Sequence, residues 1–152
     1  MGIYDRDYYQ QPPSHGSFSG PRTIVGILIL INVVVFFADG LFFADSHKLT
    51  SLFAVKVGTL LAPWMWWQFV SYGFAHAPFP PWEHIVGNML VLFFLGRDIE
   101  MLYGRKEFLR LYLALLVVSG LVWAVIEQIQ GAPANAGAVG ASGAISGIVV
   151  LY

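Results

Sequence analysis

The chain has 152 residues, of which 57% are hydrophobic and 11% are charged, and its mean hydropathy is +0.68. Soluble domains are nearer half apolar and a quarter charged, so this composition indicates a membrane protein. The net charge of −1, without a basic stripe, excludes a nucleic-acid-binding protein. The absence of cysteine excludes disulfides, thiolate metal sites and a cysteine nucleophile.

The amino-terminal part of the chain combines a polar leader with a long apolar run. Residues 1–22 are polar and contain Gly, Pro and Ser, which predicts a disordered cytoplasmic tail. Residues 23–43, TIVGILILINVVVFFADGLFF, are long enough for a first transmembrane helix. The alternative is a secretory signal, whose apolar core is shorter and precedes a small-residue cleavage site that is not evident here.

A long connection at residues 44–80 separates this helix from the next. Four of the five tryptophans fall in it or just after it, namely Trp64, Trp66, Trp67 and Trp82. Because amphipathic rings prefer the headgroup zone, we expect this loop to lie in the membrane interface.

Two more spans and a partial fourth are expected after the loop. Residues 81–103 and 105–128 predict the second and third helices, with Gly104 as the stop between them. Residues 129–141 form a loop of small residues, and apolar character resumes over 142–152, roughly half a span. The predicted fold class is therefore all-α: residues 23–152 form a partial polytopic helix bundle with three full spans and the start of a fourth.

The distribution of basic residues predicts the orientation in the membrane. The turn between the second and third helices is rich in them, whereas residues 129–141 contain no Lys or Arg; the cluster is Arg97, Arg105, Lys106 and Arg110. By the positive-inside tendency this turn and the amino terminus are cytoplasmic, and the 129–141 loop is outside. If the protein is bacterial, the plasma (inner) membrane is the expected location.

This topology brings three polar residues to similar depth near the outer face. His84 and Asn88 share one face of the second helix, and Ser142 begins the fourth. Polar groups in a span usually face the bundle interior or a wet cavity. Two donors and a hydroxyl in one place suit acyl transfer, in which donors stabilise the oxyanion. The soluble-hydrolase pattern G-x-S-x-G is not matched, because Ala144 follows Gly143.

Each of these residues also has a purely structural interpretation. Gly143 and Gly147 match the small-residue spacing of membrane helix contacts, so the serine segment is also typical of a packing face. On the same view, His84 lies among the headgroups, and Asn88 is an interhelical hydrogen-bonding group.

Four motifs together resemble the rhomboid family of intramembrane serine proteases. Gly140-Ala-Ser142-Gly is similar to the family's GxSG, and His84-Ile-Val-Gly-Asn88 to its HxxxN. GRDIE at 96–100, followed by Tyr103-Gly104, resembles the family's helix exit. The loop signature is similar at Trp67-Gln68, Ser71 and His76.

The resemblance implies a bundle of six or seven helices and a serine endopeptidase that cleaves in or near transmembrane segments. Ser142 would be the nucleophile, and its backbone N–H would form the oxyanion hole with His84 and Asn88. The implied partners are the bilayer and single-span or polytopic membrane-protein substrates, with no cofactor and no metal. The family's base is a histidine on the sixth helix, but no histidine here follows Ser142; the four are His15, His47, His76 and His84. The isolated chain is therefore expected to be inactive.

Two departures from the family and two alternative functions accompany this interpretation. Ser146 stands where some members carry an aromatic residue, and the link at 76–84 is longer and richer in proline. One alternative is a catalytically inactive relative that binds membrane clients. The other is a fragment of a transporter or channel that uses the broken segment at 131–143 as a gate.

Overall fold

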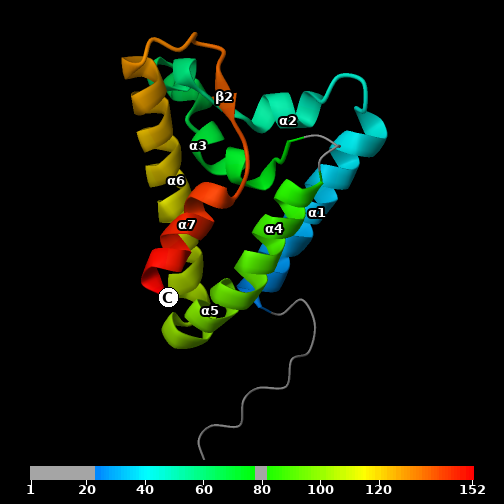
Figure 1. The fold of residues 1–152 in the computed structure, drawn as a ribbon, viewed down its shortest axis with the longest axis vertical. Helices are drawn as coiled ribbons and strands as arrows, with labels where there is room; N and C mark the ends of the chain where they lie inside the picture. Colours follow the sequence, from blue (N-terminus) through cyan, green and yellow to red (C-terminus); the bar gives the residue numbers. More distant parts are fainter. Residues whose placement is uncertain (1–22, 78–81) are drawn as a thin grey trace, which may run out of the picture.

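The computed structural model describes residues 23–77 and 82–152. The expected tail at 1–22 and the expected start of the second span at 81 lie outside the described residues. Within them the chain is predominantly helical, as predicted (Figure 1).

The first helix, α1, runs from Ile24 to Phe42 and is capped at its start by two side chains. Thr23 Oγ1 accepts a hydrogen bond from Gly26 N at 3.0 Å. The buried carboxylate of Glu100 accepts from Ile24 N at 2.8 Å and Val25 N at 2.9 Å. Because the first N–H groups of a helix have no partner within it, these acceptors define where α1 begins.

The connection after α1 is folded into short elements rather than extended. They are α2 (Lys48–Phe53), β1 (Val55–Lys56), the 3-10 turns η4 (Val57–Leu61) and η5 (Pro63–Met65), α3 (Gln68–Ser71) and η6 (Tyr72–Phe74). Gln68 is fully buried, accepts from Thr59 Oγ1 at 2.7 Å and donates to Leu52 O at 2.9 Å. This side chain therefore supplies the internal hydrogen bonds that a compact loop needs.

The four tryptophans in and after this connection have exposed side chains. They are Trp64 (77%), Trp66 (55%), Trp67 (44%) and Trp82 (55%). Their exposure is compatible with the interfacial position predicted for the loop.

The next helical run comprises α4 (Glu83–Val91), a π-helical turn η7 (Leu92–Gly96) and α5 (Arg97–Tyr103). A Cβ on Gly96 would lie 3.2 Å from Val25 Cγ2 and 3.4 Å from Phe108 Cζ, so glycine permits close packing here. Gly104, at φ +81°, turns the chain into α6 (Arg105–Ile129). A positive φ is readily adopted by glycine, which explains the stop at this position.

A short antiparallel pair departs from the all-α prediction. Strand β2 (Gly137–Ala138) pairs with β1, with Val55 opposite Ala138. Val57 N and Gly58 N continue the contact by donating to Ala136 O at 3.0 Å and Ala134 O at 2.9 Å. Such short segments carry no strand periodicity, and tertiary contacts bring them together.

The last helix, α7 (Ser142–Leu151), packs against α6 and lies between α6 and α4 (Figure 1). A Cβ on Gly143 would lie 2.5 Å from Ser119 Oγ, and one on Gly147 would lie 2.5 Å from Leu115 Cδ2. The expected small-residue packing is therefore real, and the glycines provide it.

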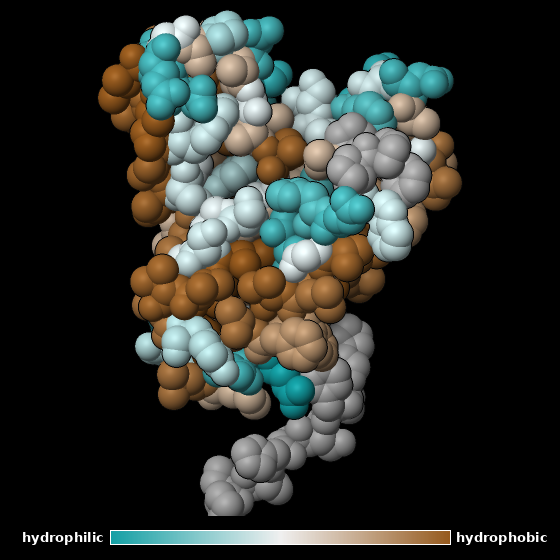
Figure 2. Space-filling view, viewed as in Figure 1, coloured by the Kyte–Doolittle hydropathy of each residue, from teal (hydrophilic) through white to brown (hydrophobic). Residues whose placement is uncertain are grey.

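Two of the described helices, α1 and α6, are long and apolar enough to cross a membrane. Only 22% of the most apolar 18-residue stretch of each is buried, whereas the core helix of a soluble protein is mostly buried. Figure 2 shows hydrophobic residues along the α6 edge and in a band across the lower middle of this face, with hydrophilic residues above and below the band. The fold is thus that of a helical membrane protein.

Candidate active site

Ser142 is the first residue of α7 and follows a turn that only small residues suit. Gly140 is buried and has φ +115°, a conformation that L side chains rarely adopt. The Ser142 side chain is exposed, and its hydroxyl forms no hydrogen bond with another described residue. Its carbonyl accepts from Ser146 Oγ at 2.8 Å. The hydroxyl is therefore accessible from outside the protein.

The serine lies deep relative to the ends of α6. Its neighbour Gly143 packs against Ser119, which is in the middle of α6. At 1.5 Å per residue, Ser119 lies about 15 Å along the axis from Ile129. Figure 1 shows α7 beginning well inside the length of α6. The non-helical backbone before Ser142 thus reaches this depth with other protein segments beside it. Membrane proteins tolerate non-helical backbone at such depth only where protein or water surrounds it.

His84 and Asn88 approach the serine turn from α4. A Cβ placed on Gly140 would lie 2.8 Å from His84 Nε2 and 3.7 Å from Asn88 Nδ2. The two side chains also contact each other, with Asn88 Nδ2 3.3 Å from His84 Nε2. His84 is exposed, whereas Asn88 is 9% exposed. The three residues singled out from the sequence therefore lie around one turn.

His76 adds a fourth polar side chain that the sequence analysis did not assign to the site. Its Nε2 lies 3.1 Å from Asn88 Nδ2, and its ring centroid lies 5.7 Å from that of His84. Burial, and then the neighbouring His84, lower the pKa of His76 from 6.5 to about 4. The His76 imidazole is therefore neutral at pH 7.

Tyr72 holds the serine turn from the other side, which the sequence analysis also missed. Its carbonyl accepts from Gly140 N at 2.8 Å, and its hydroxyl donates to Leu116 O at 2.9 Å. The hydroxyl also lies 2.8 Å from Ser119 Oγ. One residue thus ties the serine turn to α6. In the sequence, a tyrosine in this loop is only weak evidence for a role at the site, because the groups that it contacts are far away along the chain.

The two serines and the two glycines of α7 face different surroundings. Ser142 and Ser146 are exposed, whereas Gly143 and Gly147 pack closely against α6. The packing interpretation therefore accounts for the glycines and leaves the Ser142 hydroxyl without a structural role among the described residues.

Comparison with known proteins identifies the family. A family model described as the rhomboid domain matches residues 63–152, which include all the residues of the site. The chain belongs to the rhomboid family. This match confirms the resemblance drawn from the motifs.

Two curated relatives extend the rhomboid similarity to most of the chain. It is 32% identical over 125 residues to "Rhomboid-like protein 11, chloroplastic" of Arabidopsis thaliana, covering 82% of this chain and 39% of that protein. It is 25% identical over 128 residues to "Rhomboid protease GluP" of Bacillus subtilis (strain 168), covering 84% of this chain and 25% of that protein. This rhomboid chain therefore spans well under half of either relative. No solved structure matches it significantly.

Proposed function

We propose that this rhomboid, in its complete form, is an intramembrane serine endopeptidase. Its substrates are membrane proteins, and it hydrolyses a peptide bond in or near their transmembrane segments. The observation that carries the proposal is the approach of His84 and Asn88 to Gly140, two residues before an exposed Ser142.

In the proposed reaction, Ser142 Oγ attacks the scissile carbonyl as its proton passes to a base. The Ser142 N–H and the side chains of His84 and Asn88 donate to the oxyanion that forms. Collapse of this intermediate expels the amine and leaves an acyl-enzyme, which water then hydrolyses. The base that the rhomboid resemblance implies is a histidine on the sixth helix, which the 152 residues do not include. The isolated chain is therefore expected to be inactive, because an unactivated serine hydroxyl is a weak nucleophile.

The proposal is tested with the full-length protein, a fluorescent serine-reactive phosphonate and a single-span substrate in proteoliposomes. We expect Ser142→Ala to abolish both phosphonate labelling and cleavage while the protein still folds, because only one exposed hydroxyl is lost. Ser146→Ala is the matched control, since Ser146 is an exposed serine one turn further along α7. It should retain labelling and cleavage. Cleavage that survives Ser142→Ala contradicts the proposal.

A second candidate function is the binding of membrane clients without cleavage. One of the two curated relatives is named a rhomboid-like protein and not a protease, and this is the observation that favours it. In that case the full-length protein would not react with the phosphonate, and it would co-purify with a membrane client whose binding is unchanged by Ser142→Ala.

A further inference from the structure

We propose that His76 is a positioning residue for Asn88: it accepts one amide N–H and thereby directs the other toward the serine turn. This inference rests on the proposed function, in which Asn88 donates to the oxyanion. The loop before α4 would then contribute to catalysis without contacting the substrate.

The contact between the two side chains has one direction. An amide nitrogen carries two hydrogens and only donates, so His76 Nε2, at 3.1 Å, must accept. The ring is then neutral, with its proton on Nδ1. Because the two N–H bonds of an amide diverge in one plane, holding one fixes the direction of the other. By the same rule, in the resting site Asn88 donates its second N–H to His84 Nε2 at 3.3 Å, and that nitrogen lies 2.8 Å from a Cβ position on Gly140. Holding the first N–H on His76 therefore keeps the second at the edge of the serine turn, where an oxyanion would replace His84 Nε2 as its acceptor.

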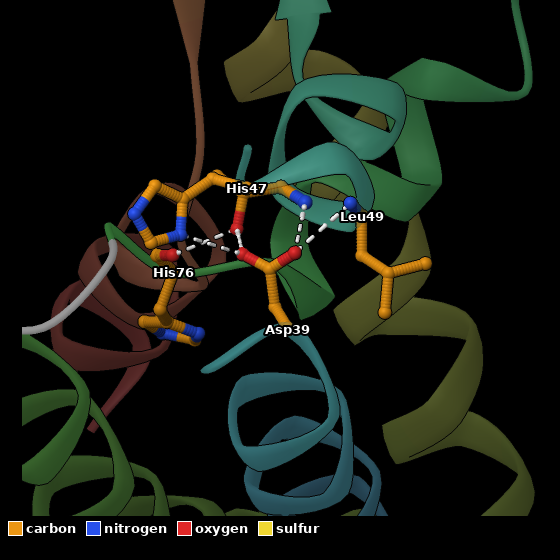
Figure 3. Close-up of polar contacts among 5 residues, drawn as sticks. Asp39, His47, Leu49 and His76 are labelled. Carbon is orange, nitrogen blue, oxygen red and sulfur yellow. Dashed lines mark hydrogen bonds and ion pairs between the residues drawn. The ribbon is translucent and has the colours of Figure 1, made fainter. Parts of the chain in front are cut away.

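His76 is itself held by a polar cluster at the end of α1 (Figure 3). The Thr50 hydroxyl shares its one hydrogen between Asp39 Oδ2 at 2.7 Å and the His76 carbonyl at 3.3 Å. Leu49 N donates to Asp39 Oδ1 at 2.9 Å, so the same carboxylate holds the start of α2. The backbone at His76 therefore contacts α2, and Asp39 in turn joins the start of α2 to the end of α1.

A purely structural role does not account for this histidine. His76 is 2% exposed, and its Nδ1 has no hydrogen-bond partner among the described residues. A buried polar atom without a partner costs free energy that an apolar side chain of similar size would avoid. Such a local cost is typical of functional positions. The charged or titratable groups that face His76 are His84 of α4, and Asp39 and His47, which border the same cavity of about 310 Å³.

A double-mutant cycle on the full-length protease tests the inference. His76→Leu removes the acceptor, and we expect kcat to fall about 10- to 100-fold with KM unchanged, as for other groups that orient a reacting side chain. His76→Gln keeps an acceptor oxygen and should recover most of the rate. Asn88→Ala should lower kcat by about 10²- to 10³-fold. Adding His76→Leu to Asn88→Ala should cause no further loss, because the donor is already absent.

The control for the cycle is His47→Leu, which removes another loop histidine that contacts Asp39 at 3.4 Å. Its effect on kcat should be the same with Asn88 present or absent. A His76→Leu effect that multiplies with that of Asn88→Ala, or one confined to KM, overturns the inference while leaving the protease intact. Cleavage that survives Ser142→Ala instead removes the proposed function itself.

A second measurement applies if His76→Leu fails to fold. In the unmutated full-length protein, ¹⁵N NMR of the His76 ring reports which nitrogen carries the proton. We expect the proton on Nδ1 at pH 7. A proton on Nε2 overturns the inference, since Nε2 would then not accept from Asn88.

Discussion

Gly140 is constrained both by its backbone conformation and by the side chains of the candidate site. Its φ of +115° turns the chain into α7, and its N–H is held by the Tyr72 carbonyl. A Cβ there would lie 2.8 Å from His84 Nε2, closer than side-chain carbons approach other atoms. A larger residue would therefore both strain the turn and displace His84. Gly140 is therefore favoured both by its backbone conformation and by the position of His84.

His76 makes a pH-dependent prediction at the same scale. Its pKa is lowered from 6.5 to about 4 by burial, with His84 as the second cause. Between these values the unfolded chain binds a proton that the folded chain does not, so stability is full above pH 6.5 and falls as the pH drops through 4. We expect a loss of up to about 3 kcal/mol between pH 7 and pH 4. Urea denaturation in detergent across this range measures it.

The control is His76→Leu, which should lack this part of the pH dependence. An equally steep dependence in the variant would mean that other groups cause it, and that the burial of His76 has no thermodynamic consequence.

At the scale of elements, α1 is joined to α5 by a buried carboxylate. Glu100 accepts from the first two N–H groups of α1, and Arg105 Nε lies 3.9 Å from its Oε1. An acidic group at a helix start also complements the positive end of the helix dipole. The GRDIE motif therefore has a structural explanation: its glutamate caps a helix more than seventy residues earlier in the chain.

Glu100→Gln should destabilise the protein by about 1–3 kcal/mol, because the amide keeps only one acceptor oxygen and leaves a buried N–H without a partner. The free energy of unfolding in detergent measures the effect. Glu107→Gln is the matched control: Glu107 is exposed, and its one ion pair within the described residues is with exposed Arg110. Its loss should cost no more than about 1 kcal/mol. Equal effects of the two changes on the free energy of unfolding would mean that the Glu100 cap on α1 contributes no more to stability than an exposed ion pair does.

At the scale of the whole molecule, the basic turn and the serine loop lie at opposite ends of α6. Gly104 precedes α6, and three of the four clustered basic residues, Arg105, Lys106 and Arg110, lie in its first two turns. Residues 130–141 follow the other end of α6 (Figure 1). A helix of this length and hydropathy is long enough to reach from one side of a bilayer to the other, so we expect these ends on opposite sides. The asymmetry of charge then predicts which side is cytoplasmic.

The absence of cysteine allows a direct test of this orientation. Single substitutions Tyr103→Cys and Asn135→Cys introduce thiols at exposed positions on either side of α6. We expect a membrane-impermeant maleimide to label Asn135→Cys in intact cells and Tyr103→Cys only after permeabilisation. The reverse pattern would show that the basic turn is outside and that the predicted orientation is wrong.

The sequence by itself determined the helical membrane character, the family and the pairing of His84 with Asn88. Long apolar runs indicate helices that are buried in lipid. A spacing of four residues places two side chains on the same face of a helix, whatever surrounds that helix. The motifs around Ser142 then led to the rhomboid family, which the family match confirms.

Only the tertiary structure decided which distant groups complete the site and the scaffold. Glu100 bonds to Val25 across 75 positions, β1 pairs with β2, and His76 meets Asn88 from a separate loop. The residues around each partner do not predict such contacts. A single glutamate or histidine in a sequence does not indicate whether its side chain is solvated or hydrogen-bonded to a distant group. These polar contacts depend on which distant segments the packed fold brings together. A local sequence pattern does not contain that information, so only the folded structure shows the contacts.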